Sequence, residues 1–359
     1  SDQEEIAEDV LPGSSTPASP ANDHLITEGE KSAIVEGVKA LVNLGRALED
    51  FDAFSEPLPL TDGVTLGQLL RPHELLDTRL AKQVYDFFED ATDPPTMNGL
   101  LDVLKGLTGT SDLLLNVEDV SASHDSILSV LAFTVALEAT RKGEVCLKSD
   151  SLTSELGFTY REDIHGAYDA VIKIDLTFGV EHQNDSDSFF VRITELGAHL
   201  NIQANIPQHD AAAITNSSPL RIVNGTVNLD VKVDVQPTEA IADEGRISLA
   251  ELQGLTPETI GNLVHITATG TLVAKLSLTY NSKAAAQDHP AIYVDIESNN
   301  FFVDPTRKVS INVDISTLKD SILSLMKRID VVVEKTTDFD QLIAMLSLVS
   351  GGISSGTSS

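Results

Sequence analysis

The residues whose types and spacing could do chemistry lie around Gly245. An EF-hand calcium loop carries oxygen ligands at positions 1, 3, 5, 9 and 12, and a glycine at position 6. Placing Gly245 at position 6 puts Glu244 at position 5, Ser248 at position 9 and Glu251 at position 12. Oxygen atoms of this kind are the ligands that calcium prefers. Glu244, Ser248 and Glu251 are therefore the candidate metal ligands, with calcium as the candidate ion.

Two positions of this loop lack a ligand side chain. Ala240 would occupy position 1 and Ala242 position 3, where an EF-hand loop carries Asp or Asn. A second interpretation needs no ion: a turn is followed by a helix whose N-cap is Ser248, and Glu251 completes a capping box. The missing ligands favour the capped turn, so we expect removal of calcium to change the thermal stability little.

No catalytic constellation stands out in the sequence. The chain contains no HExxH, CxxC or P-loop motif, and no two of its nine histidines have the four-residue spacing of a helical metal site. The single cysteine, Cys146, cannot form an internal disulfide, and its apolar neighbours predict a buried, inert thiol. We therefore expect a protein that is not an enzyme.

The charge of the chain limits its partners. Its 24 Lys and Arg residues against 55 Asp and Glu residues give a formal net charge of −31. Nucleic-acid binding needs clustered Lys and Arg, so nucleic acid is not an expected partner. No stretch approaches the run of about 18 apolar residues that a membrane span requires, so we expect no transmembrane segment.

The segments that would position the candidate residues alternate between apolar and polar side chains. Such a period of two is the signature of a strand with one buried face. It is clearest in the row Val227, Leu229, Val231, Val233 and Val235, and similar rows occur within 131–137, 168–178, 190–206, 263–280, 292–296 and 309–315. The pattern predicts roughly seven strands, with a turn at Lys142-Gly143. The Asp residues between the apolar positions could hold cations weakly, but a solvated outer face is the more common explanation of such rows.

Helical spacing precedes and follows these strands. Thr27 and Glu30 have the spacing of a capping box and begin a long helix, Thr65 can cap a short one, and Pro72 suits the first turn of another. Further helical patterns cover 97–107, 317–333 and 339–348. Segregated runs of helices and strands predict an α+β fold with an antiparallel sheet. Long one-sided strands predict that this sheet is strongly curved and packed on amphipathic helices from both ends of the chain.

The composition divides the chain into five parts. We expect an acidic, Ser- and Pro-rich linker at 1–26, a helical segment at 27–110, an antiparallel β domain at 111–316, C-terminal helices at 317–350 and a Gly/Ser linker at 351–359.

Three segments resemble a known kind of module: FFVRITELGAHLNI (189–202), LRIVNGTVNLDVKVDV (220–235) and GRISLAELQG (245–254). They are similar to a repeat-type module of very large secreted or surface proteins of aquatic bacteria. In that module the loop before the third segment is a fuller, Asp-rich EF-hand-like sequence, from which this chain departs at Ala240 and Ala242. The resemblance covers about residues 160–315 and implies an extracellular, multi-module context without catalytic residues.

Two functions are open at this point. The first is a non-enzymatic structural or adhesive module of a large extracellular or cell-surface protein or assembly, whose partners are neighbouring modules or other copies of the same chain. The second is a carrier that holds a lipid or another hydrophobic ligand between the curved sheet and a helix, since the pattern also resembles the tubular lipid-binding fold. Small inward residues would leave room for such a ligand, unless helices fill the space: Ala170, Ala198, Ala204 and Ala274.

Overall fold

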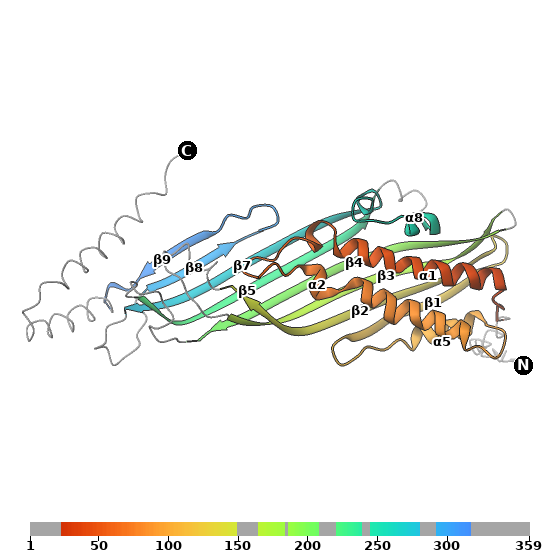
Figure 1. Cartoon of the computed structure of the whole chain (residues 1–359), viewed down its shortest axis with the longest axis horizontal. Helices are drawn as coiled ribbons and strands as arrows, with labels where there is room; N and C mark the ends of the chain where they lie inside the picture. The colour runs from red at the N-terminus through yellow and green to blue at the C-terminus, as the bar shows by residue number, and fades with distance from the viewer. Residues whose placement is uncertain are drawn as a thin grey trace, which may run out of the picture.

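A layer of helices lies on one face of a long antiparallel sheet (Figure 1). The computed structural model describes residues 23–148, 164–183, 186–207, 220–238, 245–280 and 292–316.

The helical layer begins with α1 (Glu28–Glu49), which starts at the expected capping box. The Thr27 backbone N–H donates to Glu30 Oε2 at 2.7 Å, and the Glu30 N–H donates to Thr27 Oγ1 at 3.2 Å. These two bonds satisfy donors that the first helical turn leaves without a partner. Ile34, Leu41 and Leu48 lie on the buried stripe of α1, with at most 1% of each exposed.

The remaining helices of the layer are short. Thr65 caps α2 with a second capping box, as the sequence predicts, and Arg71 then adopts a left-handed conformation (φ 49°) before Pro72 begins the next helix. A π-helical stretch follows. The elements are η1 (Asp52–Phe54), α2 (Leu66–Leu70), α3 (Pro72–Glu74), the π-helix η2 (Leu75–Ala81), α4 (Lys82–Glu89) and α5 (Met97–Lys105).

The sheet contains nine strands in the described part of the chain, and every neighbouring pair is antiparallel. Its order is β1-β2-β3-β4-β5-β7-β8-β9, with the short β6 paired to β4. The strands are β1 (Leu114–Asp125), β2 (Val130–Leu147), β3 (Ile164–Gln183), β4 (Ser186–Ile206), β5 (Leu220–Pro237), β6 (Ile247–Ser248), β7 (Val264–Tyr280), β8 (Ile292–Ser298) and β9 (Lys308–Val313). Two short elements stand between β6 and β7, namely α8 (Leu249–Gln253) and η5 (Ile260–Asn262).

The alternation expected from the sequence is confirmed along β5. Val227, Leu229, Val231, Val233 and Val235 are all buried, whereas the residues between them are exposed or half-buried. The pleat of a strand sends successive side chains to opposite faces, so each long strand has an apolar inner face and a polar outer face.

The expected turn at Lys142-Gly143 is wrong, because both residues lie inside β2. The sequence pattern predicts roughly seven strands, whereas the described sheet has nine, because the pattern does not indicate β1 and β6. Gly143 stands opposite Tyr168 of β3, and a Cβ atom there would lie 2.7 Å from the tyrosine ring. This glycine makes room for a neighbouring side chain, so it is not a sign of chain reversal.

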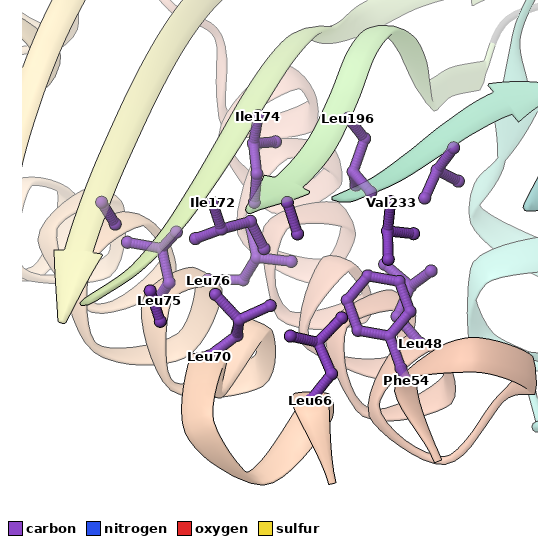
Figure 2. Close-up of a cluster of buried hydrophobic side chains, with 14 of the residues drawn as sticks. Leu48, Phe54, Leu66, Leu70, Leu75, Leu76, Ile172, Ile174, Leu196 and Val233 are labelled. Carbon is purple, nitrogen blue, oxygen red and sulfur yellow. The ribbon is translucent and has the colours of Figure 1, made fainter. Parts of the chain in front are cut away.

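The helices pack on the inner face of the sheet. Figure 2 shows this interface near α2, where side chains from the helical layer meet side chains from β3, β4 and β5. The labelled residues are Leu48, Phe54, Leu66, Leu70, Leu75, Leu76, Ile172, Ile174, Leu196 and Val233. All ten are at most 2% exposed, so the two layers share one hydrophobic core.

Glycines allow α1 to approach its neighbours closely. A Cβ atom at Gly37 would lie only 2.1–2.3 Å from three ring atoms of Phe189, which belongs to β4 and is 2% exposed. A Cβ atom at Gly45 would lie 2.6 Å from the backbone of His73. Gly37 therefore allows α1 to lie close to the sheet, and Gly45 allows it to lie close to α3.

The C-terminal helices expected within 317–350, and both expected linkers apart from residues 23–26, lie outside the described residues. The strong curvature of the sheet and its packing on helices from both ends of the chain stay predictions. None of the described helices is long and apolar enough to cross a membrane.

Replacing Gly37 by alanine tests the contact between α1 and β4. Alanine favours a helix by about 1 kcal/mol over glycine. The clash with the buried Phe189 ring should outweigh this gain and lower the free energy of unfolding by about 1–3 kcal/mol in urea denaturation. Gly29→Ala in the same helix is the matched control, since its Cβ would meet only the carboxylate end of Asp187. Equal stabilities of the two variants would contradict the close packing.

Candidate functional site

Ser248 and Glu251, two of the three candidate calcium ligands, form the N-terminal cap of α8. The Ser248 backbone N–H and hydroxyl both donate to Glu251 Oε2 at 2.7 Å, and the Glu251 N–H donates to Ser248 Oγ at 3.4 Å. This is the capping box that the alternative interpretation of the loop predicts, and it is confirmed. Glu244, the third candidate, lies outside the described residues.

The segment from Gly245 to Gly254 connects the sheet with the helical layer. Gly245 has a φ of 63°, a left-handed conformation that glycine adopts without strain. Arg246 Nη1 then donates to Glu181 Oε2 at 2.6 Å, and its guanidinium lies 4.3 Å from the centre of the Phe190 ring. β6 pairs with β4, and α8 packs on α1. The local geometry thus fixes the segment at both layers.

Among the residues that the structure describes, no further group completes a metal site beside the capping pair. In the described ranges no three His, Cys, Asp or Glu side chains lie together in a way that could hold a metal ion. Calcium binding by Glu244, Ser248 and Glu251 therefore stays a prediction, because it depends on where the Glu244 carboxylate lies and Glu244 is outside the described residues.

The outer face of the sheet carries polar side chains that pair across strands. Lys142 Nζ lies 2.8 Å from Asp169, and Lys173 Nζ lies 2.8 Å from Glu138. Cross-strand pairs of this kind stabilise a sheet by a few tenths of a kcal/mol each and fix its register. Further contacts join His199 to Asp230, Asn201 to Asn228 and Thr134 to Thr177.

Carboxylates gather on this face around Asp175. A register irregularity follows Asp175 in the β3–β4 pair, and another lies between Val117 and Asp119 in the β1–β2 pair. Partial burial, reinforced by the nearby carboxylates of Glu195 and Glu118, raises the pKa of Asp175 above its usual value, and Lys173 opposes this shift only in part. Sequence reasoning picked out Asp175 as an outward residue but not this cluster, since the strands that carry it are far apart in the chain.

Cys146 is exposed, so the prediction of a buried thiol is wrong. Val145 and Leu147 are the buried neighbours on the inner face, and the pleat sends Cys146 to the outer face. Its sulfur lies 3.6 Å from Nδ1 of His165. An apolar context in the sequence therefore did not imply burial of the middle residue.

The strands at the two margins of the sheet differ from each other. β1, at one margin, contains a register irregularity and carries Glu118 and Asp119 side by side. β9, at the other, pairs regularly with β8 and carries Lys308 as its only charged residue. The apolar residues of β9 were predicted, but their exposure was not, because exposure depends on what lies beside the strand.

The chain also contains one sequence pattern that is typical of hydrolases. Residues 352–356 read GISSG, which has the GxSxG spacing of a nucleophile elbow. The pattern lies outside the described residues, in a stretch so rich in Gly and Ser that the spacing arises readily from composition alone.

Comparison of the chain with family models, curated proteins and solved structures finds no match.

Ser248→Ala separates the capping role from an ionic one. Loss of the cap should lower the free energy of unfolding by about 1 kcal/mol, because the first turn of α8 loses its acceptor. The loss should be the same in calcium and in EDTA when unfolding is followed by circular dichroism. Thr65→Ala, at the N-cap of α2, is the matched control. A loss at Ser248 that occurs only in calcium would indicate that the loop binds the ion.

Asp175→Asn tests the carboxylate cluster. A raised pKa means that the folded state binds the Asp175 proton more tightly than the unfolded state does. The charged carboxylate therefore destabilises the folded state fully at neutral pH, and this destabilisation disappears as the pH falls through the folded pKa. The variant should therefore gain about 0.5 kcal/mol in free energy of unfolding at pH 7, and less at acidic pH. Asp295→Asn on β8 removes one charge away from the cluster. The same gain in both variants at every pH would contradict this account.

Proposed function

We propose that the protein is a non-enzymatic structural or adhesive module that works in an extracellular or cell-surface assembly. The observation that carries this proposal is the course of the chain along the molecule. α1 begins near one end of the long axis, and β9 lies towards the other end (Figure 1). A module with this course can be joined to neighbours along its length and acts as a spacer between them.

The dimensions of the sheet support a role as a spacer. β2, β3, β4, β5 and β7 contain 17 to 21 residues each. Strands of this length extend over about 55–70 Å. The ladder between them is continuous except for single irregularities, and the helical layer covers its inner face with a packed core. Such a body resists bending better than separate helices or hairpins would.

Exposed apolar side chains support contacts with neighbouring molecules. Large exposed apolar residues mark interaction sites when they gather, whereas single ones need no explanation. In the described ranges Val309 and Ile311 lie together on β9 with Ile315 just after it, whereas Ile127 and Leu128 lie in the turn after β1 and Leu114 lies at the other end of that strand. Neighbouring modules or other copies of the chain are the partners that we propose.

A carrier of lipid or of another hydrophobic ligand is the second candidate. The observation in its favour is that Ala170, Ala198, Ala204 and Ala274 all face inward, as predicted. Near α2, however, side chains of the helical layer pack directly against side chains of β3, β4 and β5 (Figure 2). We therefore favour the structural function, with the strongly curved sheet packed on its own helices and not around a ligand.

Ala170→Leu distinguishes the two functions. Ala170 is fully buried, so in a packed interior the larger side chain should lower the free energy of unfolding by about 1–3 kcal/mol. In a carrier the added side chain would enter the ligand space and displace ligand at little cost. Native mass spectrometry of the unmodified protein, followed by organic extraction, should give the mass of one chain or of two, without a bound lipid. A stoichiometric lipid in the extract, together with a tolerated Ala170→Leu, would overturn the structural function.

A further inference from the structure

β9 is the last strand of the described sheet, and its apolar row is uncovered. Val309 pairs with Ile296 of β8, and Ile311 pairs with Val294. Both partners are at most 1% exposed, which places Val309 and Ile311 on the apolar inner face. Yet Val309 is 36% exposed and Ile311 is 61% exposed. The core therefore ends at β8, and the inner face continues onto β9 without a described neighbour.

β9 carries fewer of the features that protect an edge strand than β1 does. Natural sheets discourage pairing at their edges with charges, bulges and prolines. β1 has this protection in its register irregularity and in its acidic pair, Glu118 and Asp119. β9 has the sequence KVSINV, whose one charge, Lys308, stands at its first residue, and it has neither a bulge nor a proline. Such an edge is suited to pairing with another strand.

We propose that β9 pairs antiparallel with β9 of a second copy of this chain, about a two-fold axis that passes through Ile311. In this register Ile311 faces Ile311 of the other copy, and Val309 faces Val313. Ser310 faces Asn312, and Lys308 faces Asp314 just beyond the strand. Every apolar residue then meets an apolar residue on the inner face, and each end of the pairing joins opposite charges.

The self-complementarity of β9 identifies the second copy as the occupant. A shift of the register by one residue would place apolar residues opposite polar ones. A shift by two residues would separate Lys308 from Asp314. A two-fold axis makes an isologous contact, in which the same surface of both copies is used and the assembly closes as a dimer. The result would be one sheet that continues through both molecules.

The net charge of the chain gives this contact a characteristic dependence on salt. Two copies that each carry a formal charge of −31 repel each other at long range. Salt screens this repulsion, with a Debye length of about 10 Å at 0.1 M, and leaves backbone hydrogen bonds and apolar contacts largely intact. Dimerisation through β9 should therefore become stronger as the ionic strength rises.

The β9–β9 contact rests on the proposed function and extends it, since it names a partner and a contact surface for the structural module. The two ideas fail in different experiments. A chain that is monomeric and free of lipid would contradict the β9 contact but not the structural function. A stoichiometric lipid would contradict the structural function, whatever the oligomeric state of the chain.

Disulfide trapping tests the register. In a Cys146→Ser background, Ile311→Cys places two thiols opposite each other, where paired Cα atoms are about 4.5–5.5 Å apart and a disulfide fits. Val309→Cys is the matched control, because its two copies would lie about 13 Å apart along the strands. Mild oxidation should give a covalent dimer with Ile311→Cys and not with Val309→Cys. Equal yields from both variants, or none from either, would overturn the proposal.

Sedimentation velocity tests the contact without a crosslink. The unmodified chain should shift from monomer towards dimer as salt is added, and Ile311→Lys should weaken the dimer at least about tenfold by placing two ammonium groups together. Ile127→Lys introduces the same change at a residue that is 91% exposed at the opposite margin of the sheet, and it should dimerise like the unmodified chain. A monomer at every salt concentration, as expected if residues after 316 cover β9, would overturn the proposal, as would equal weakening by both lysines.

Discussion

The apolar inner face of the sheet is the constraint on which the rest of the structure depends. Because the pleat alternates side chains between two faces, long strands with a period of two collect their apolar residues on one side. That surface must be covered, and α1 covers part of it at a distance that Gly37 permits. The helical layer is therefore arranged to fit the sheet, and its short elements follow the same surface.

One charged side chain interrupts this apolar face and helps to place the helices on it. Arg141 of β2 is only 5% exposed, and its Nε donates to the carbonyl oxygen of Leu70 at 3.1 Å, where α2 ends. Its Nη2 lies 3.0 Å from the Glu74 carboxylate, which neutralises the buried charge although the hydrogen-bond geometry is poor. A charge at this depth is tolerated only with such partners, so the contact specifies how the layers meet.

The need to cover the apolar inner face also explains why the margins of the sheet are candidate contact surfaces. Inside the sheet every strand has neighbours on both sides, and its inner residues lie under other elements. At β9 the inner row continues while its cover does not. The candidate ion loop, by contrast, uses Ser248 and Glu251 to cap α8, and this helix packs on α1. In the described structure the loop is thus a connection between layers.

The sequence by itself determined whatever depends on near neighbours in the chain. The caps at Thr27, Thr65 and Ser248 follow from spacings of three residues, and the inner rows follow from alternation. Only the tertiary structure decided what depends on contacts between distant segments. Gly143 looked like a turn until Tyr168 was found beside it, and Cys146 looked buried until the pleat sent it outward. The exposure of Ile311 was likewise undecidable from its own apolar pattern, because burial is a property of the neighbouring surface and not of the residue.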